Sequence, residues 1–160
     1  SVACWGYNQA GTLGDGTYDD RYVPSPTLGF TAGLDAVLLS SGYYHTCALL
    51  SDDSISCWGS NEFGQIGNGE IDGNLGVSTP YSIPEFGPGS NASLVRAGGH
   101  ATCAVTTDGE LYCWGYKALK GVTEIINTFL HLPIFHTLEP MSLTCLLADT
   151  TLVHCWKTDQ

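Results

Sequence analysis

The sequence predicts an all-β fold made of repeated antiparallel sheets, and three observations support this prediction. Pairs of cysteines ten residues apart occur three times, each around a polar turn. Each pair encloses two apolar residues that face each other and is flanked by a threonine and a tryptophan. The 20 glycines, and the prolines between apolar runs, are typical of a turn-rich β protein.

The segment HTCALLSDDSISCWG, residues 45–59, is expected to form a β-hairpin closed by a disulfide. An antiparallel hairpin that turns midway between Cys47 and Cys57 places the two cysteines directly opposite each other. Opposite residues have Cβ atoms about 4.5–5.5 Å apart, within reach of a disulfide after slight local closing. Since side chains alternate between the faces of a strand, Leu49 and Ile55 share the apolar face of the two cysteines.

The same unit recurs at residues 102–115 and 144–156, so the sequence predicts three disulfides of equal spacing. Each closes a loop of about 11 residues and contributes roughly 3 kcal/mol in the chain-entropy model. Cys4 is left unpaired, because its repeat partner would lie upstream of Ser1. We therefore expect the protein to continue upstream, where an export signal would lie. The predicted bonds are Cys47–Cys57, Cys103–Cys113 and Cys145–Cys155.

The hairpins belong to a longer repeat. Residues 8–16 match residues 61–69 at an offset of 53, and the cysteines match at an offset of 56. A period of this length is typical of propellers and stacked arrays. We predict an incomplete β-propeller of four-stranded blades, about two full blades plus partial ends. In each blade the stapled hairpin follows two further strands, at about 25–30 and 36–40 in one blade and about 81–86 and 93–97 in the next.

Two parts of the chain differ in regularity. Residues 1–115 hold the regular repeats, and residues 116–160 are predicted to be a degenerate or capping repeat of the same array. After Gly115 the glycine loop is missing, and an apolar segment takes its place. Its period does not decide between one strand and a short helix that ends before Pro133.

The segments CWGYNQAGTLGDGT and LSSGYYHTCALLSDDSISCWGSNEFGQIGNG resemble the repeats of the regulator of chromosome condensation family. The shared features are a Gly-x-x-His-Thr start, an Ala-Leu strand, a Trp-Gly strand end and an Asn-x-x-Gly-Gln-Leu-Gly loop. The resemblance covers residues 1–115 and part of 140–156, and it implies a propeller. The stapled hairpins resemble exported members, including bacterial secreted proteins and the ectodomain of CRINKLY-type plant receptor kinases.

Composition excludes several kinds of partner. The chain has a formal net charge of −11 and only five Lys and Arg in 160 residues. Nucleic-acid binding requires basic side chains that displace counterions from phosphates, so no DNA or RNA partner is expected. Attraction to an anionic membrane fails for the same reason, and no apolar run approaches the roughly 20 residues of a membrane helix. Paired cysteines favour an extracellular or secreted protein.

The candidate sites are each weighed against a structural role. The recurring glycine loops lack the ending of a P-loop and are expected to be scaffold turns. The tryptophans are expected to pack between blades rather than form a ligand platform. His45 and His100 are expected to satisfy turns at the start of the repeat. Since no nucleophile elbow, zinc pair or paired-carboxylate motif occurs, we expect no catalytic site and no required cofactor.

Two loops of variable length are the predicted contacts with a partner, residues 15–24 and 69–80. Their acidic residues would suit calcium, but the EF-hand spacing is missing and solvated loops are the expected alternative. Asn91-Ala92-Ser93 fits the N-glycosylation sequon, so Asn91 is a candidate site of modification. The loop residues predicted to meet a partner are Asp15, Asp19, Asp20, Arg21, Glu70 and Asp72.

The first functional hypothesis is a non-catalytic extracellular protein-binding module, part of a larger secreted or receptor propeller, with a protein partner. The resemblance to ligand-binding ectodomains and to a secreted propeller inhibitor of β-lactamases supports it. The second hypothesis is guanine-nucleotide exchange on a small GTPase, as the family's nuclear founder performs. The third is a secreted hydrolase that uses the acidic loops.

Overall fold

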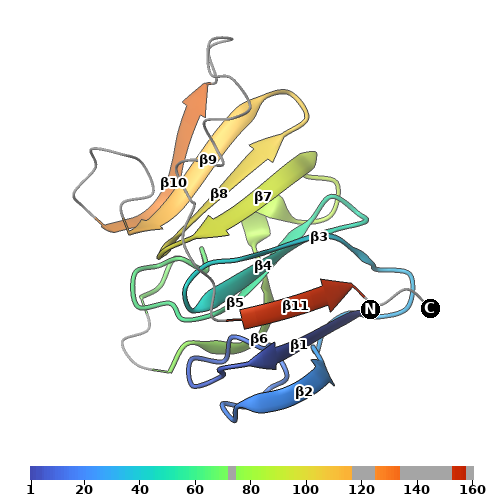
Figure 1. The fold of residues 1–160 in the computed structure, drawn as a ribbon. Coiled ribbons are helices and arrows are strands. Elements are labelled where there is room, and N and C mark those ends of the chain that lie inside the picture. Colours follow the sequence, from blue (N-terminus) through green and yellow to red (C-terminus); the bar gives the residue numbers. More distant parts are fainter. Residues whose placement is uncertain (72–74, 117–124, 134–152, 158–160) are drawn as a thin grey trace.

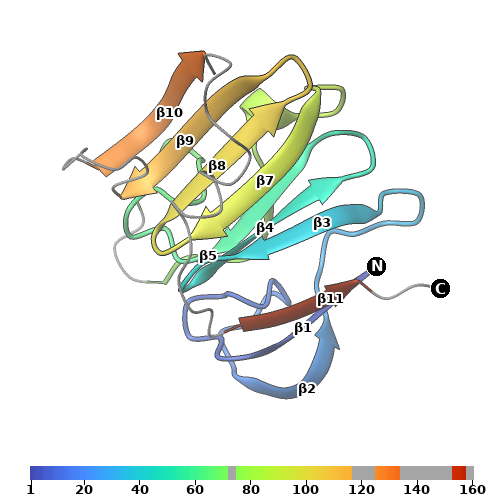
Figure 2. The ribbon, with the colours of Figure 1, turned by 45° about the horizontal axis from the view of Figure 1, so that its top comes forward.

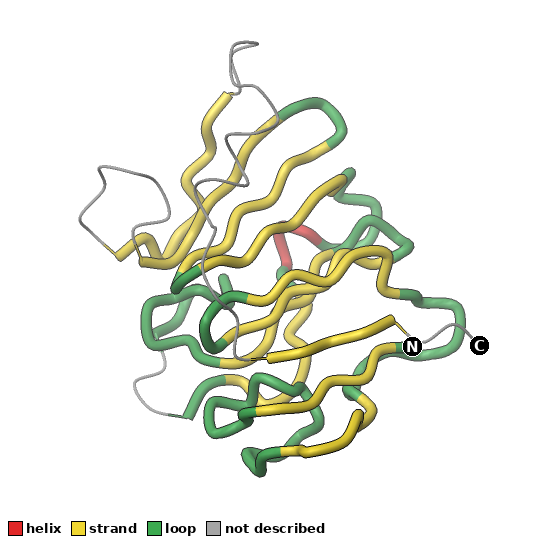
Figure 3. The backbone as a smooth tube through the Cα atoms, viewed as in Figure 1, coloured by secondary structure: helices red, strands yellow, loops and turns green. Residues whose placement is uncertain are grey.

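The computed structural model describes residues 1–71, 75–116, 125–133 and 153–157 (Figure 1). These residues form eleven β-strands and one short 3-10 helix, η1 (Pro84–Phe86). Figure 3 shows that strands and the loops between them make up nearly all of the described residues. The strands are β1 (Val2–Gly6), β2 (Arg21–Pro26), β3 (Ala36–Ser41), β4 (His45–Leu50), β5 (Ile55–Gly59), β6 (Val77–Ser82), β7 (Ala92–Gly98), β8 (Ala101–Thr106), β9 (Glu110–Tyr116), β10 (Ile125–Pro133) and β11 (Val153–Lys157).

The strands form three antiparallel sheets, which confirms the predicted all-β fold with two four-stranded blades and a partial one. The sheet orders are β11-β1-β2, β3-β4-β5-β6 and β10-β9-β8-β7. Figures 1 and 2 show the sheets following one another side by side, as blades do in a propeller. β10 completes the third sheet by pairing with β9, so the apolar segment before Pro133 is a strand over residues 125–133. The division at residue 115 stays a prediction.

Two of the three predicted hairpins are present in the predicted register, and most of the third, residues 144–156, lies outside the described residues. Cys47 lies opposite Cys57 and Cys103 lies opposite Cys113, and each pair is joined by a disulfide. The flanking pairs also match, since Thr46 faces Trp58. An even spacing within one hairpin fixes both the register and the face, which is why these pairs follow from the sequence alone.

The outer strand of each blade differs from the prediction. We expected a strand at 25–30 and at 81–86, leading into the following hairpin. β2 and β6 instead lie before and within the proline turn and pair with the preceding strands β1 and β5. Each is an edge strand, where proline is tolerated because one side of the strand needs no ladder hydrogen bonds. Residues 84–86 form η1, whose Phe86 is buried.

The third predicted disulfide is wrong. Cys155 is bonded to Cys4, which we expected to be unpaired, and the two Cα atoms are 4.3 Å apart. β11 pairs with the edge of β1 that β2 leaves free, so that Cys4 lies directly opposite Cys155. The bond joins residues 151 positions apart. Cys145 lies outside the described residues.

This pairing gives a first prediction. Non-reducing digestion at acid pH, followed by mass spectrometry, is expected to release a cross-linked peptide pair that contains Cys4 and Cys155. The two hairpin disulfides serve as internal controls, because each should appear at full occupancy in the same digest. A peptide that links Cys145 to Cys155 would instead restore the pairing expected from the repeat.

The buried core lies in two layers between neighbouring sheets. One face of the β4–β5 hairpin supplies both cysteines with Leu49 and Ile55, as predicted, and packs on Val95 of β7. The other face supplies Ala48, Leu50 and Trp58 and packs against the sheet of β1. Each large apolar side chain buried in this way stabilises the fold by roughly 1.5–3 kcal/mol. A blade therefore depends on both neighbours for its burial.

Candidate functional site

The loops gather at one end of the blades, which we call the loop face. β1, β3, β5, β7 and β9 end there, and the next strand of each sheet begins there. The described residues of the loop face are 7–20, 42–44, 60–71, 75–76 and 99–100. It lies on the left of the molecule in Figure 1. The opposite end of the stapled hairpins carries only short turns, such as residues 51–54 and 107–109.

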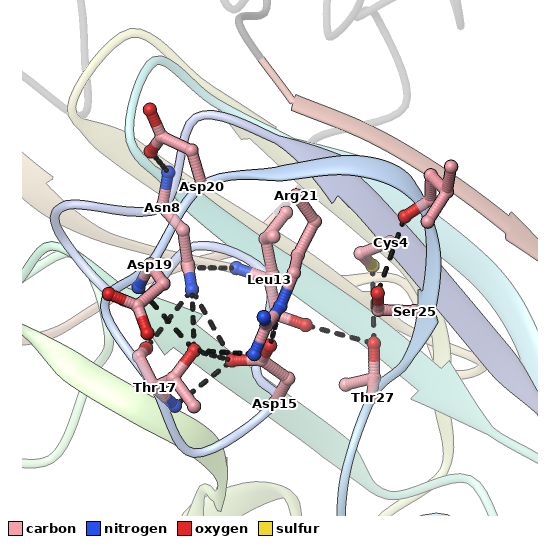
Figure 4. A network of polar contacts seen from close by, with 11 residues as sticks. Cys4, Asn8, Leu13, Asp15, Thr17, Asp19, Asp20, Arg21, Ser25 and Thr27 are labelled. Carbon is pink, nitrogen blue, oxygen red and sulfur yellow. Dashed lines mark hydrogen bonds and ion pairs between the residues drawn. The ribbon is translucent and has the colours of Figure 1, made fainter.

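The two glycine loops on this face are built around an asparagine. Asn8 Oδ1 accepts a hydrogen bond from the backbone N–H of Leu13 at 2.9 Å, and its Nδ2 donates to the carbonyl of Thr17 at 3.1 Å (Figure 4). Asn61 makes the same bonds with Ile66 and Glu70, at 3.0 Å each. The side-chain amide of each asparagine bonds to the backbone of its own loop and holds that loop closed, so the loops are scaffold turns, as expected.

Each glycine loop also anchors the next hairpin. Trp58 Nε1 donates to the carbonyl oxygen of Thr12 at 2.9 Å, and Thr46 Oγ1 donates to the same oxygen at 3.3 Å. In the next repeat, Trp114 and Thr102 converge on the carbonyl oxygen of Gln65 in the same way. Both tryptophans are fully buried. The repeated Thr–Trp pair therefore packs between blades, as the sequence predicted.

One glycine of each loop is required by this contact. Gly67 has φ +80°, and a Cβ atom there would lie 2.8 Å from Nε1 of Trp114. Gly67→Ala is expected to lower the free energy of unfolding by about 2–4 kcal/mol, because strain and overpacking add. Gly69 is the control, since its φ is +78° but no atom lies within 4 Å of its Cβ position. Gly69→Ala should cost only about 1–2 kcal/mol, and equal losses in urea unfolding would contradict the clash.

Most of the predicted contact residues in the first loop serve the loop itself. Arg21 Nε is 2.8 Å from Asp15 Oδ2, and Asp20 Oδ1 accepts the N–H of Asn8 at 2.8 Å (Figure 4). Burial acts to raise the pKa of Asp15, but hydrogen bonds from Thr17 and Arg21 outweigh it and hold the pKa below its ordinary value. The carboxylates of Asp15 and Asp20 are therefore structural.

The remaining predicted contacts stay exposed or lie outside the described residues. Asp19 and Glu70 are exposed, and the backbone of Glu70 closes the second glycine loop. Asp72 lies outside the described residues. Among the described residues of the set that the sequence proposed, Asp19 and Glu70 therefore offer the exposed carboxylates.

The two variable loops lie side by side. The N–H of Gly16 donates to the carbonyl of Ser78 at 2.9 Å, and the hydroxyl of Tyr18 donates to the carbonyl of Gly76 at 3.2 Å. Exposed apolar side chains accompany this contact, with Tyr18 38% and Leu75 65% accessible. The sequence predicted both loops as contacts without showing that they meet. Their contact makes one surface from two blades.

The sequence suggested that the ring of His45 satisfies a turn, but the ring instead contacts the neighbouring sheet. It is fully buried, and its Nε2 lies 2.9 Å from Thr102 Oγ1 in the next sheet. Burial first, and then the nearby His100, lowers the pKa of His45 to about 3, so its ring is neutral. A second inter-blade bond runs beside it, from the N–H of Tyr43 to the carbonyl of Gly99 at 2.9 Å. His45 therefore links two neighbouring blades through a buried hydrogen bond.

A row of six rings crosses the loop face, and sequence reasoning missed it. Neighbouring ring centroids lie 5.9 Å apart for Tyr7 and Tyr44, 6.2 Å for Tyr44 and His100, 4.8 Å for His100 and Phe63, and 5.0 Å for Phe63 and Tyr116. A signal was present, because Tyr44 and His100 share one repeat position and Tyr7 and Tyr116 both follow Trp-Gly. We call this set the aromatic row: Tyr7, Tyr43, Tyr44, Phe63, His100 and Tyr116.

Other predicted sites receive less support from the geometry. Within the described residues, no three His, Cys, Asp or Glu side chains gather as metal ligands would. No helix in the same part of the chain is long and apolar enough to cross a membrane. Asn91 is exposed with φ +61°, and its carbonyl accepts the N–H of Thr107 at 2.8 Å. Its side chain is thus placed on the surface, and its glycosylation stays a prediction.

Comparisons of the sequence with known proteins give the family. The description "Regulator of chromosome condensation (RCC1) repeat" matches residues 36–65 and 93–116 in one family profile and residues 1–49 in another. The ultraviolet-B receptor UVR8 of Arabidopsis thaliana is 34% identical over 115 residues, which cover 72% of this chain and 25% of the receptor. Human E3 ubiquitin-protein ligase HERC2 is 32% identical over 113 residues, 69% of this chain and 2% of the ligase.

Solved structures agree on the fold. Yeast RCC1 (Prp20) bound to Kap60 superposes with a TM-score of 0.69 at 24% identity, over 85% of this chain and 34% of that one. Human WBSCR16 superposes with a TM-score of 0.68 at 21% identity, over 82% and 33%. The chain thus spans about a third of these structures and a quarter or less of the two curated relatives. It belongs to the regulator of chromosome condensation repeat family, and its stapled sheets are β-propeller blades of that family.

Proposed function

We propose that this chain is a non-catalytic, extracellular protein-binding module and forms part of a larger propeller. One observation carries the proposal: the two loops of variable length meet on one face and expose Tyr18 and Leu75 beside Asp19 and Glu70. Binding residues are commonly displayed on loops that a rigid scaffold positions. Here the scaffold consists of sheets held by disulfides and by inter-blade hydrogen bonds.

Relatives support a protein partner without identifying one. Prp20p from Saccharomyces cerevisiae, which shares the fold, has binding properties to Gsp1p and histones. The same yeast protein has also been solved in a complex with Kap60. Because a fold does not fix a function, these partners are properties of the yeast protein, and the loops of this chain differ in length even between its own repeats.

The binding proposal is tested by changing the loop surface alone. Immobilised wild-type protein is incubated with extracellular fluid of the source organism, beside the double variant Tyr18→Ser/Leu75→Ser. The control is Val37→Ser, because Val37 is 59% exposed and lies on β3 near the opposite end of the blade. We expect a defined protein that the wild type and the control recover and the double variant does not. Identical recovery by all three would overturn the proposal.

The alternative activities have direct assays on the same purified protein. Catalysed release of guanine nucleotide from a panel of small GTPases would favour an exchange factor. Turnover of ester, peptide or glycoside substrates, with and without calcium, would favour a hydrolase. We expect neither activity, because the sequence contains no nucleophile elbow, zinc pair or paired-carboxylate motif.

The extracellular placement is tested through the thiols. Protein taken from its native source is alkylated in denaturant, first without and then with prior reduction. Peptide mapping of residues 1–160 is expected to show one labelled cysteine before reduction and seven after, because three disulfides block six of the seven cysteines in these residues. Disulfides persist in oxidising compartments, so seven thiols reactive from the outset would contradict export.

A further inference from the structure

We propose that the aromatic row binds an extended, basic peptide segment of the protein partner, with Lys or Arg side chains set on the ring faces. This inference rests on the proposed function and gives it a second surface and a partner chemistry. The row is distinct from the variable-loop surface, but both lie on the loop face.

The row is continuous across the blades. Tyr7 follows β1, Tyr43 and Tyr44 form the turn between β3 and β4, Phe63 lies in the second glycine loop, and His100 precedes β8. Each ring lies within 6.4 Å of the next, centroid to centroid. All six rings are partly exposed, and Tyr7 has the largest accessible fraction at 37%. A partner can therefore reach ring surface from one blade to the next.

The tilt of the rings disfavours a sugar platform. A pyranose stacks on a flat aromatic face, and several sugars in a row need rings that lie in roughly one plane. The angles between neighbouring rings range from 31° for Tyr44 and His100 and 37° for Phe63 and Tyr116 to 57° for Tyr7 and Tyr44 and 79° for Tyr43 and His100, so the six rings do not share one plane. Such rings present separate faces and edges, which suit compact cationic groups better than a flat ligand.

Charge favours a basic ligand. Aromatic faces carry negative electrostatic potential and attract Lys and Arg within about 6 Å of the ring centroid. The chain has a net charge of −11, and the loop face adds exposed carboxylates at Asp19, Glu62 and Glu70. The described residues of the loops on this face include no Lys or Arg, and Arg21 at the start of β2 is paired with Asp15. The ring faces and the nearby carboxylates thus both attract a basic segment along the row.

His100 carries no positive charge that would repel a cation. Burial lowers its pKa, although the nearby Glu62 acts in the opposite direction, so the ring is neutral at pH 7. Its Nδ1 has no hydrogen-bond partner within the described structure. The ring therefore behaves as one more neutral aromatic face between Tyr44 and Phe63.

The spacing of the rings fits an extended chain. A β-strand rises about 3.3 Å per residue, so alternate side chains on one face are about 6.6 Å apart. The rings of the row follow one another at 4.8–6.2 Å along the path from Tyr7 to Tyr116. Basic residues at every second position can thus meet successive rings.

The test uses the purified chain and a fluorescent peptide of alternating Arg and Gly, measured by anisotropy at 50 and 300 mM NaCl. We expect saturable binding that weakens with salt. Tyr44→Leu/Phe63→Leu keeps apolar area but removes two ring faces, and it should weaken binding 10-fold or more, since each cation–π contact is worth about 0.5–2 kcal/mol. Phe63→Tyr should bind normally, and Glu62→Gln should bind 2- to 5-fold more weakly.

The matched control is Tyr22→Leu, which removes an aromatic ring that is 91% exposed on β2 and outside the row. Equal losses for this control and for the double variant would overturn the proposal, because they indicate attraction by net charge alone. Equal binding by wild type and the double variant, or preference for a Glu-Gly peptide or chitohexaose, would also overturn it. Unchanged thermal unfolding of each variant shows that the loss is local.

The two proposals fail in different ways. Loss of peptide binding with retained, loop-dependent capture of a partner refutes the aromatic row and leaves the proposed function standing. Peptide binding without any loop-dependent partner supports the row and refutes the loop surface.

Discussion

Trp58→Ala is expected to lower the free energy of unfolding by about 3–5 kcal/mol, enough to unfold much of the protein. The indole is fully buried between two sheets, and its N–H is bonded to the carbonyl of Thr12 at 2.9 Å. Its ring also meets Phe30 edge to face at 5.9 Å. The substitution leaves a cavity and removes the shorter of the two hydrogen bonds that the carbonyl of Thr12 accepts, so that of the two only the bond from the hydroxyl of Thr46 still holds the loop. Urea unfolding followed by circular dichroism measures the loss.

Trp5 provides the matched control, because it holds the same position in the repeat but is partly exposed. Trp5→Ala should cost clearly less than Trp58→Ala. Trp58→Phe separates the two contributions, since it keeps most of the apolar volume and loses the N–H bond, at a cost of about 1–3 kcal/mol. If Trp5→Ala and Trp58→Ala cost the same, burial between blades does not explain the repeated tryptophan.

Acid is expected to destabilise the protein well before its carboxylates are protonated, through His45. Burial lowers the pKa of His45 to about 3, whereas an unfolded histidine titrates near 6.5. Above pH 6.5 the ring is neutral in both states and the full stability is present. Below pH 6.5 His45 binds a proton in the unfolded state but stays neutral in the folded state. The free energy of unfolding therefore falls by about 1.4 kcal/mol per pH unit until pH 3.

The expected loss between pH 6.5 and pH 3 is therefore roughly 4–5 kcal/mol from His45 alone. His100, whose pKa is also lowered, acts in the same direction. The measurement is the urea midpoint at half-unit steps of pH. His45→Gln should be less stable at pH 7 but show a flatter profile, and His100→Gln should change the slope less. A wild-type midpoint that is level from pH 7 to pH 4.5 would refute the buried neutral ring.

Local features of this fold follow from the sequence, because the residues that determine them lie close together along the chain. The spacing of Cys47 and Cys57 sets the register of a hairpin, its disulfide and its buried face at once. The pairing of Thr46 with Trp58 can be predicted for the same reason. The carbonyl of Thr12, which accepts hydrogen bonds from both side chains, cannot be predicted, because it lies on the preceding loop.

Long-range features do not follow from spacing. The Cys4–Cys155 bond depends on which strand edge stays open, and no local pattern records that. The outer strands were misplaced because a proline turn looks the same whether a strand enters or leaves it. The aromatic row escaped notice since its rings come from separate turns, and each looks like an ordinary turn residue until the blades are set side by side.

The disulfide between β1 and β11 also determines how the chain responds to a pulling force. Stretching the molecule from residues 1 and 157 would load the covalent bridge between Cys4 and Cys155, so the chain between these two cysteines would carry no tension. The blades would then lengthen under force only after a reductant cuts that bridge. A thiol reagent, rather than force, would decide whether this segment can be drawn out.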